Sequence, residues 1–101
     1  MRTGNLMVDA EVPAQGERFD TLLSHRNLVV ERIVSSADTT PVEYLQSQDE
    51  WVVLLTGSAM LELAGEVLEL HAGDSVFIPS GTPHTVRRVS HGAQWLAVHL
   101  H

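Results

Sequence analysis

From Leu28 to the end of the chain, short runs of strand-forming residues alternate with turn-forming residues. This alternation restricts the fold more than any other feature of the sequence. The runs are rich in β-branched and aliphatic residues, and most alternate apolar with polar positions. They end at the turn-forming stretches ADTTP, TG, AG, AGD and PSGTP. No sustained helical pattern lies between them, so crossover βαβ units and a parallel sheet are not expected. The spacing predicts an all-β sandwich or barrel.

The N-terminal region has a different pattern. In GERFDTLLSHRN, Phe19, Leu22 and Leu23 stand at i, i+3 and i+4, which predicts a short amphipathic helix. We therefore expect an N-terminal arm with this helix over residues 1–27, packed on a barrel domain over residues 28–101. A chain of 101 residues is long enough for one compact domain and too short for two.

Charge and residue usage exclude several classes of function. The net charge is -7, from 6 basic and 13 acidic residues, so neither nucleic acid nor an anionic membrane surface is an expected partner. The chain has no cysteine, which excludes disulfides, thiolate metal sites and a cysteine nucleophile. Its longest apolar runs, such as WVVLL, are too short to span a bilayer, and its first residues lack the pattern of a signal peptide. We expect a cytoplasmic protein.

Period-two alternation assigns side chains to the two faces of each expected strand. If Glu50 points into the barrel, Val52 and Leu54 do too. A few polar side chains then converge inside an otherwise aliphatic barrel: Tyr44, Gln46, Glu50 and His84. Convergent polar groups in an apolar cavity are typical of a small-molecule site.

The segment GDSVFIPSGTPH, residues 73–84, directs one of these side chains. Pro79 and Pro83 fix φ and lack a backbone donor, so the chain leaves the sheet there and re-enters it at His84. Gly81 allows a sharp bend between the two prolines. The segment therefore predicts a histidine at the start of a strand, aimed into the mouth of the barrel.

At these residues the chain resembles the cupin superfamily. The second motif of that family is Gly, five residues, Pro, one residue, Gly, two residues and His, then three residues and Asn. Its first four positions fall here without a gap on Gly73, Pro79, Gly81 and His84. Arg88 stands where the family has Asn.

The first motif matches in part. Its closing Glu, six residues and Gly correspond to Glu50 and Gly57, whereas Tyr44 and Gln46 occupy the places of its opening His-x-His. The resemblance spans about residues 41–90 and implies a single small jelly-roll β-barrel, similar to small single-domain bacterial cupins. A chain this short often pairs strands or apolar faces across a dimer, so we expect a homodimer.

The resemblance also implies a candidate metal site. Cupins with the full motif hold a divalent iron, manganese, zinc or nickel ion on three His and one Glu. Carried over by position, Gln46, Glu50 and His84 are the candidate metal ligands, and Tyr44 is the candidate hydrogen-bond donor or acid. One imidazole, one carboxylate and one amide form a weak zinc site, so manganese or iron(II) fits better. No organic cofactor is expected.

Three functions remain open from the sequence. The leading hypothesis is a metal-binding cupin, and whether it is an enzyme acting on a small polar metabolite is left open. The alternatives are a metal-free module that binds or senses a small ligand, and a structural protein with a vestigial site.

Two further side chains have an open orientation. Arg88 either shares the inner face with His84, where it would need an anion, or turns to solvent. His99 shares a face with Trp95 and Ala97, and is expected either to pack in the core or to line the pocket. The remaining histidines are expected at turns, beside the helix or at the chain end, without a functional role: His25, His71, His91 and His101.

Overall fold

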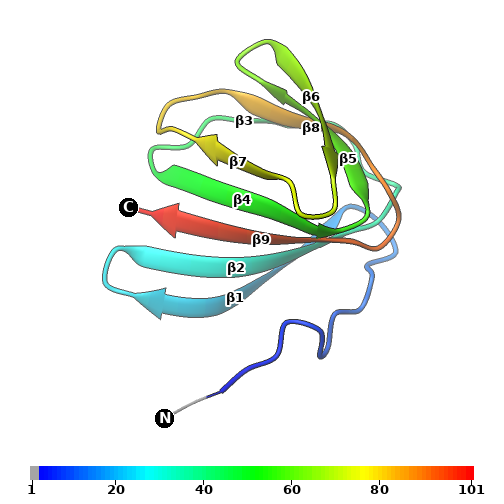
Figure 1. Cartoon of the computed structure of the whole chain (residues 1–101), viewed down its shortest axis with the longest axis vertical. Helices are drawn as coiled ribbons and strands as arrows, with labels where there is room; N and C mark the ends of the chain where they lie inside the picture. Colours follow the sequence, from blue (N-terminus) through cyan, green and yellow to red (C-terminus); the bar gives the residue numbers. More distant parts are fainter. Residues whose placement is uncertain (1–2) are drawn as a thin grey trace.

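The computed structural model describes residues 3–101 and contains only β-structure in that range (Figure 1). Its nine strands are β1 (Glu17–His25), β2 (Leu28–Ser35), β3 (Glu43–Tyr44), β4 (Asp49–Thr56), β5 (Ser58–Leu63), β6 (Glu66–His71), β7 (Ser75–Ile78), β8 (His84–Val89) and β9 (Ala93–Leu100). No helix in this part of the chain is available to cross a membrane. Strands β2 and β4–β9 follow the predicted runs closely, whereas β3 is only two residues long.

The strands form two antiparallel sheets that face each other as a small barrel (Figure 1). One sheet has the order β1-β2-β9-β4-β7, and the other has the order β3-β8-β5-β6. Strands distant in sequence are therefore neighbours, as when β9 lies between β2 and β4. The predicted all-β jelly-roll barrel is confirmed.

The predicted N-terminal helix is wrong, because Glu17–His25 forms strand β1 and pairs with β2 along its length. A bulge between Thr21 and Leu23 inserts Leu22, and this irregularity produced the helix-like spacing of apolar residues. All three apolar side chains are largely exposed, and Phe19 also contributes to the lining of the cavity described below. An isolated helix of this length is marginal in water, while pairing with β2 satisfies the backbone groups of the segment.

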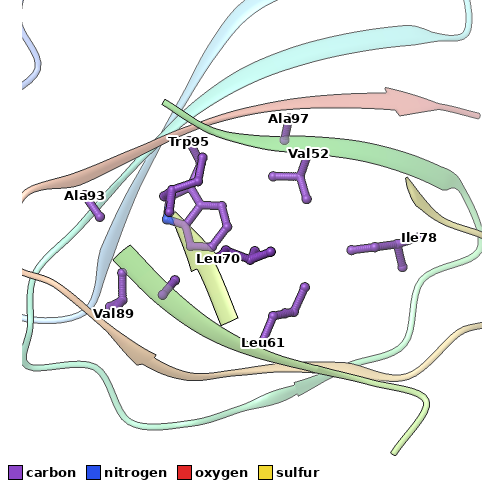
Figure 2. Packing of buried hydrophobic residues seen from close by; sticks show 10 residues of the cluster. Val52, Leu61, Leu70, Ile78, Val89, Ala93, Trp95 and Ala97 are labelled. Atoms are coloured by element: carbon purple, nitrogen blue, oxygen red, sulfur yellow. The ribbon is translucent and has the colours of Figure 1, made fainter. Parts of the chain in front are cut away.

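The hydrophobic core lies between the two sheets (Figure 2). Val52 and Leu54 of β4 and Trp95 of β9 enter it from one sheet, and Leu61 and Leu70 enter it from the other. Val52 and Leu54 are the two of these positions that strand alternation assigned to the inner face together with Glu50. The core therefore confirms the predicted period of two.

A bulge in β8 settles the orientation of Arg88. Met60 pairs with Arg88, but the next residue of β5, Leu61, pairs with Val86, so Arg87 is an additional residue. The insertion reverses the alternation after Val86. Arg88 consequently lies on the exposed face, the second of its two open orientations.

Candidate functional site

A cavity of about 80 Å³ lies between the sheets at the end of the barrel where β4 and β8 begin and β9 ends. A single water needs roughly 10–15 Å³ of such space, so the cavity has room for a small molecule. Its walls are mainly apolar: Phe19, Ile33, Val52, Leu61, Ile78, Val86 and Trp95. Its polar lining consists of Glu17, Glu31, Tyr44, Gln46, Glu50, His84 and His99. All four site residues predicted from the sequence therefore line one cavity.

The turn before β8 brings His84 to this cavity. The amide of Gly81, a residue with φ of +74°, donates to the carbonyl of Gln46 over 2.8 Å. Ser80 donates its hydroxyl to the carbonyl of Ser47 and its amide to Asp49 Oδ1. These bonds join the turn to the loop that enters β4, so the segments that carry His84 and Gln46 are held against each other.

The tautomer of His84 follows from its hydrogen bond. Its Nδ1 lies 3.0 Å from the carbonyl oxygen of Thr82, which can only accept, so Nδ1 carries the proton. In the neutral ring, Nε2 then presents a lone pair. Among the described residues Nε2 makes no hydrogen bond, although the side chain is only 8% exposed.

Glu50 is at the centre of the polar lining. Its Oε1 accepts a 2.7 Å hydrogen bond from the Gln46 amide nitrogen. The same oxygen lies 3.9 Å from Nε2 of His84 and 4.0 Å from Nδ1 of His99. One carboxylate oxygen therefore faces an amide and two imidazole rings.

His99 and Glu31 join the site, although the sequence did not single out Glu31. His99 is the strand partner of Glu50 across β4 and β9, and its Nε2 lies 3.0 Å from Glu31 Oε1. Because a carboxylate accepts, Nε2 donates, and Nδ1 is left as an acceptor that Gln48 approaches at 3.3 Å. The face shared with Trp95 was the signal for His99. Glu31 was detectable only as an acidic residue inside an apolar run.

Glu17 and Tyr44 stand nearer the rim. Burial raises the pKa of Glu17 above its usual 4.5, and a hydrogen bond from Ser35 opposes that shift. Burial, and secondly the charge of Glu17, raise the pKa of Tyr44 above its usual 10.0. The phenol is thus protonated at neutral pH, and its ring stacks on His84 with centroids 5.7 Å apart. Tyr44 is suited to donate a hydrogen bond and unsuited to bind a metal as phenolate.

The candidate metal-ligand atoms around the cavity are not oriented to hold a metal ion. Gln46 turns an N–H group toward Glu50, whereas a metal ligand would turn its carbonyl oxygen inward. Within residues 3–101 no three side chains of His, Cys, Asp or Glu form a group able to hold a metal ion. The candidate ligands Gln46, Glu50 and His84 share the cavity without forming a coordination set.

The barrel and its internal polar cavity define a class of protein. The family model of the cupin domain matches residues 29–99, so the chain belongs to the cupin domain family. The predicted resemblance is confirmed.

Individual relatives extend this result. The crystal structure of a Ralstonia eutropha JMP134 protein, assigned provisionally as a mannose-6-phosphate isomerase, is similar to this chain, with 35% sequence identity and a TM-score of 0.88. The match covers 99% of this chain and 98% of that one. An uncharacterised protein of Streptomyces coelicolor is 26% identical over 91 residues, which are 90% of this chain and 87% of the relative.

A more distant structure shares the fold alone. It is a Thermotoga maritima protein described as a predicted oxalate decarboxylase, with 21% identity and a TM-score of 0.73 over 83% of this chain and 79% of that one.

Proposed function

We propose that this protein binds a small organic molecule directly in the barrel cavity, through hydrogen bonds to Glu50 and His84. The observation that carries the proposal is the free Nε2 of His84. The His84 side chain is only 8% exposed, and in the neutral ring Nε2 offers a lone pair to which a ligand in the cavity can donate. The apolar walls would enclose the remainder of the ligand.

Tyr44 and Gln46 would position the ligand. The phenol of Tyr44 stacks on His84 and is a donor at neutral pH, so it would mark one side of the binding position. The Gln46 amide fixes the carboxylate of Glu50 through its 2.7 Å bond. These roles correspond to recognition and leave open whether a reaction follows binding.

Metal binding is the second candidate. It is supported by the positions of His84 Nε2 and His99 Nδ1, 3.9 and 4.0 Å from Glu50 Oε1, and by the metal sites of full-motif cupins. It would require the Gln46 amide to turn its oxygen inward. A bound divalent ion would supply Lewis-acid chemistry beside Tyr44.

A thermal-shift screen in the presence of a chelator tests the proposal. The screen contains alcohols, sugars, amines, carboxylic acids and sugar phosphates. We expect at least one class to raise the melting temperature of the wild-type protein. His84→Phe, which keeps a ring against Tyr44 and removes Nε2, should weaken that binding at least tenfold. His71→Phe changes an exposed histidine outside the cavity and should leave binding unchanged.

The outcomes separate the two candidates. Stabilisation by manganese, iron, zinc or nickel that appears only without chelator, with no effect of any organic compound, would replace the proposal with the metal site. Equal ligand responses in wild type and His84→Phe would refute the role of His84.

A further inference from the structure

Three glutamates line the cavity, and its basic side chains among residues 3–101 are two histidines, His84 and His99. Glu17, Glu31 and Glu50 line it, and none of its lining residues among residues 3–101 is an arginine. The sequence contains no lysine at all. An anionic ligand would therefore meet these glutamates without a permanent counter-charge such as an arginine or lysine.

Four arginines have partners on the outside of the barrel. Arg18 and Arg32 pair with Asp20, on the outward side of β1 and β2. Arg87 pairs with Glu62 on an exposed face, and Arg88 reaches the sulfur of Met60. None of these groups lines the cavity.

The buried polar side chains Glu50, His84 and His99 present acceptors around one carboxylate oxygen. In the neutral rings, Nε2 of His84 presents a free lone pair and Nδ1 of His99 presents one that Gln48 already approaches at 3.3 Å, because the opposite nitrogen of each ring donates to an oxygen. Both lone pairs lie within 4.0 Å of Glu50 Oε1. A ligand group placed among them must donate several hydrogen bonds, and a primary ammonium group has three donors and no acceptor.

The walls around these acceptors favour a positive charge attached to hydrocarbon. Phe19, Tyr44 and Trp95 contribute three aromatic rings to the lining, and aromatic faces attract cations. Leu61 and Ile78 supply aliphatic surface on other strands. The lining thus combines acceptors and carboxylates with an apolar enclosure.

We infer that the ligand is a small primary amine bound as its ammonium ion, a statement that rests on the proposed binding of an organic molecule. Its N–H groups would donate to Glu50, His84 and His99, and its carbon skeleton would lie against the apolar walls. This assignment differs from the phosphorylated sugar named for the Ralstonia eutropha relative.

A matched series of four-carbon compounds tests this inference. Butylamine, 1-butanol, butyrate and butyl phosphate share a skeleton and differ in the charge of the head group. Calorimetric titration of the whole protein at pH 7.5 with chelator should give butylamine at least tenfold tighter binding than 1-butanol. Butyrate and butyl phosphate should bind more weakly than the alcohol.

Two variants test whether the charge of Glu50 causes the preference for butylamine over 1-butanol. Glu50→Gln keeps an oxygen that accepts from Gln46 but removes the charge, so the advantage of butylamine over 1-butanol should shrink at least threefold. Glu66→Gln removes one charge on an exposed residue of the β5–β6 hairpin, outside the cavity, and should keep the advantage.

Failures of the two proposals are distinguishable. If 1-butanol or an anion binds as tightly as butylamine, the amine assignment is overturned while organic ligand binding stands. An amine preference that survives in Glu50→Gln would also overturn the assignment. If no compound of this series or of the wider screen binds, both proposals fall.

Discussion

Ser35 links the core of the barrel to the rim of its cavity. Its Oγ accepts a 3.1 Å hydrogen bond from Trp95 Nε1 and donates a 2.6 Å bond to Glu17 Oε2. The serine is fully buried and its bond with Trp95 is shielded from water, whereas its bond to Glu17 is partly buried. A single hydroxyl therefore fixes the indole and holds a carboxylate that burial penalises.

The pKa of Glu17 leads to a prediction about pH. Because that pKa is raised in the folded state, the folded protein holds the proton more tightly than the unfolded chain. This contribution to stability is fully present below pH 4.5 and is lost as pH rises through the folded pKa. Glu17→Gln, which still accepts from Ser35, should therefore be more stable than wild type at neutral pH.

Urea unfolding between pH 4 and pH 8 measures the effect. The fall in stability of wild type with rising pH should be smaller in Glu17→Gln, whereas Glu43→Gln, at an exposed residue of β3, should follow wild type. A wild-type profile shared by both variants would contradict the prediction.

Residues of the site differ in how far the sequence predicted them. His84 and Glu50 were each placed at the cavity by the spacing of residues in their own short segment. This was possible because a turn and the start of a strand are local features. Glu31 and Glu17 depend on strand pairing across the sheet, which the sequence does not encode locally. His99 was left open because its role depends on Glu50, a strand partner 49 positions earlier in the chain.

At the level of elements, the β4–β5 connection has no room for a side chain at Gly57. Gly57 has a φ of +90°, and an added Cβ would lie 2.5 Å from Ser90 Oγ and 2.9 Å from Ala93 Cβ. Ser90 in turn accepts from the amide of Ser58. The turn therefore needs both a left-handed backbone and the absence of a side chain.

Two glycine substitutions separate these requirements. Gly57→Ala should destabilise the fold by about 3 kcal/mol or more, combining backbone strain with steric overlap. Gly65→Ala has a φ of +85° and open space around the added carbon, so it should cost only the strain, about 1–2 kcal/mol. Chemical unfolding of both variants gives the comparison, and equal losses would show that the close approach is unimportant.

Elements were predicted well where alternation was regular. The runs from Leu28 onward gave β2 and β4–β9 nearly to the residue, because the turn signals between them are glycine- or proline-based. Strand β1 was mistaken for a helix because the bulge at Leu22 disturbs its period of two. The bulge at Arg87 similarly hid the orientation of Arg88.

On the scale of the whole molecule, Arg32 fastens the N-terminal arm to the barrel. Its guanidinium donates to the carbonyls of Leu6, Val8 and Asp9 and to the carboxylate of Asp20. The side chain is only 6% exposed, so the arm covers it. One cation on the outer face of β2 thereby organises a segment far from it in sequence.

Removing this cation should release the arm. Arg32→Ala should accelerate cleavage after Glu11 by a glutamate-specific protease at least tenfold, because the arm loses its main attachment. Arg18→Ala is the matched control, since Arg18 contacts Asp20 and makes none of the bonds to the arm. Unchanged cleavage in Arg32→Ala would contradict the role of the guanidinium.

The homodimer expected from the size of the chain stays a prediction. Several apolar side chains of the barrel are exposed, among them Phe19, Trp51 and Phe77.

The extra residue in β8 has a consequence for comparing this chain with its relatives. Aligned positions before Val86 compare side chains that face the same way. After Arg87 they do so only if the relative carries the same insertion. Arg88 occupies the last position of the second cupin motif, yet it points to solvent. An alignment column at that position can therefore pair residues from opposite faces of a strand, and a role inferred from the column would be assigned to the wrong surface.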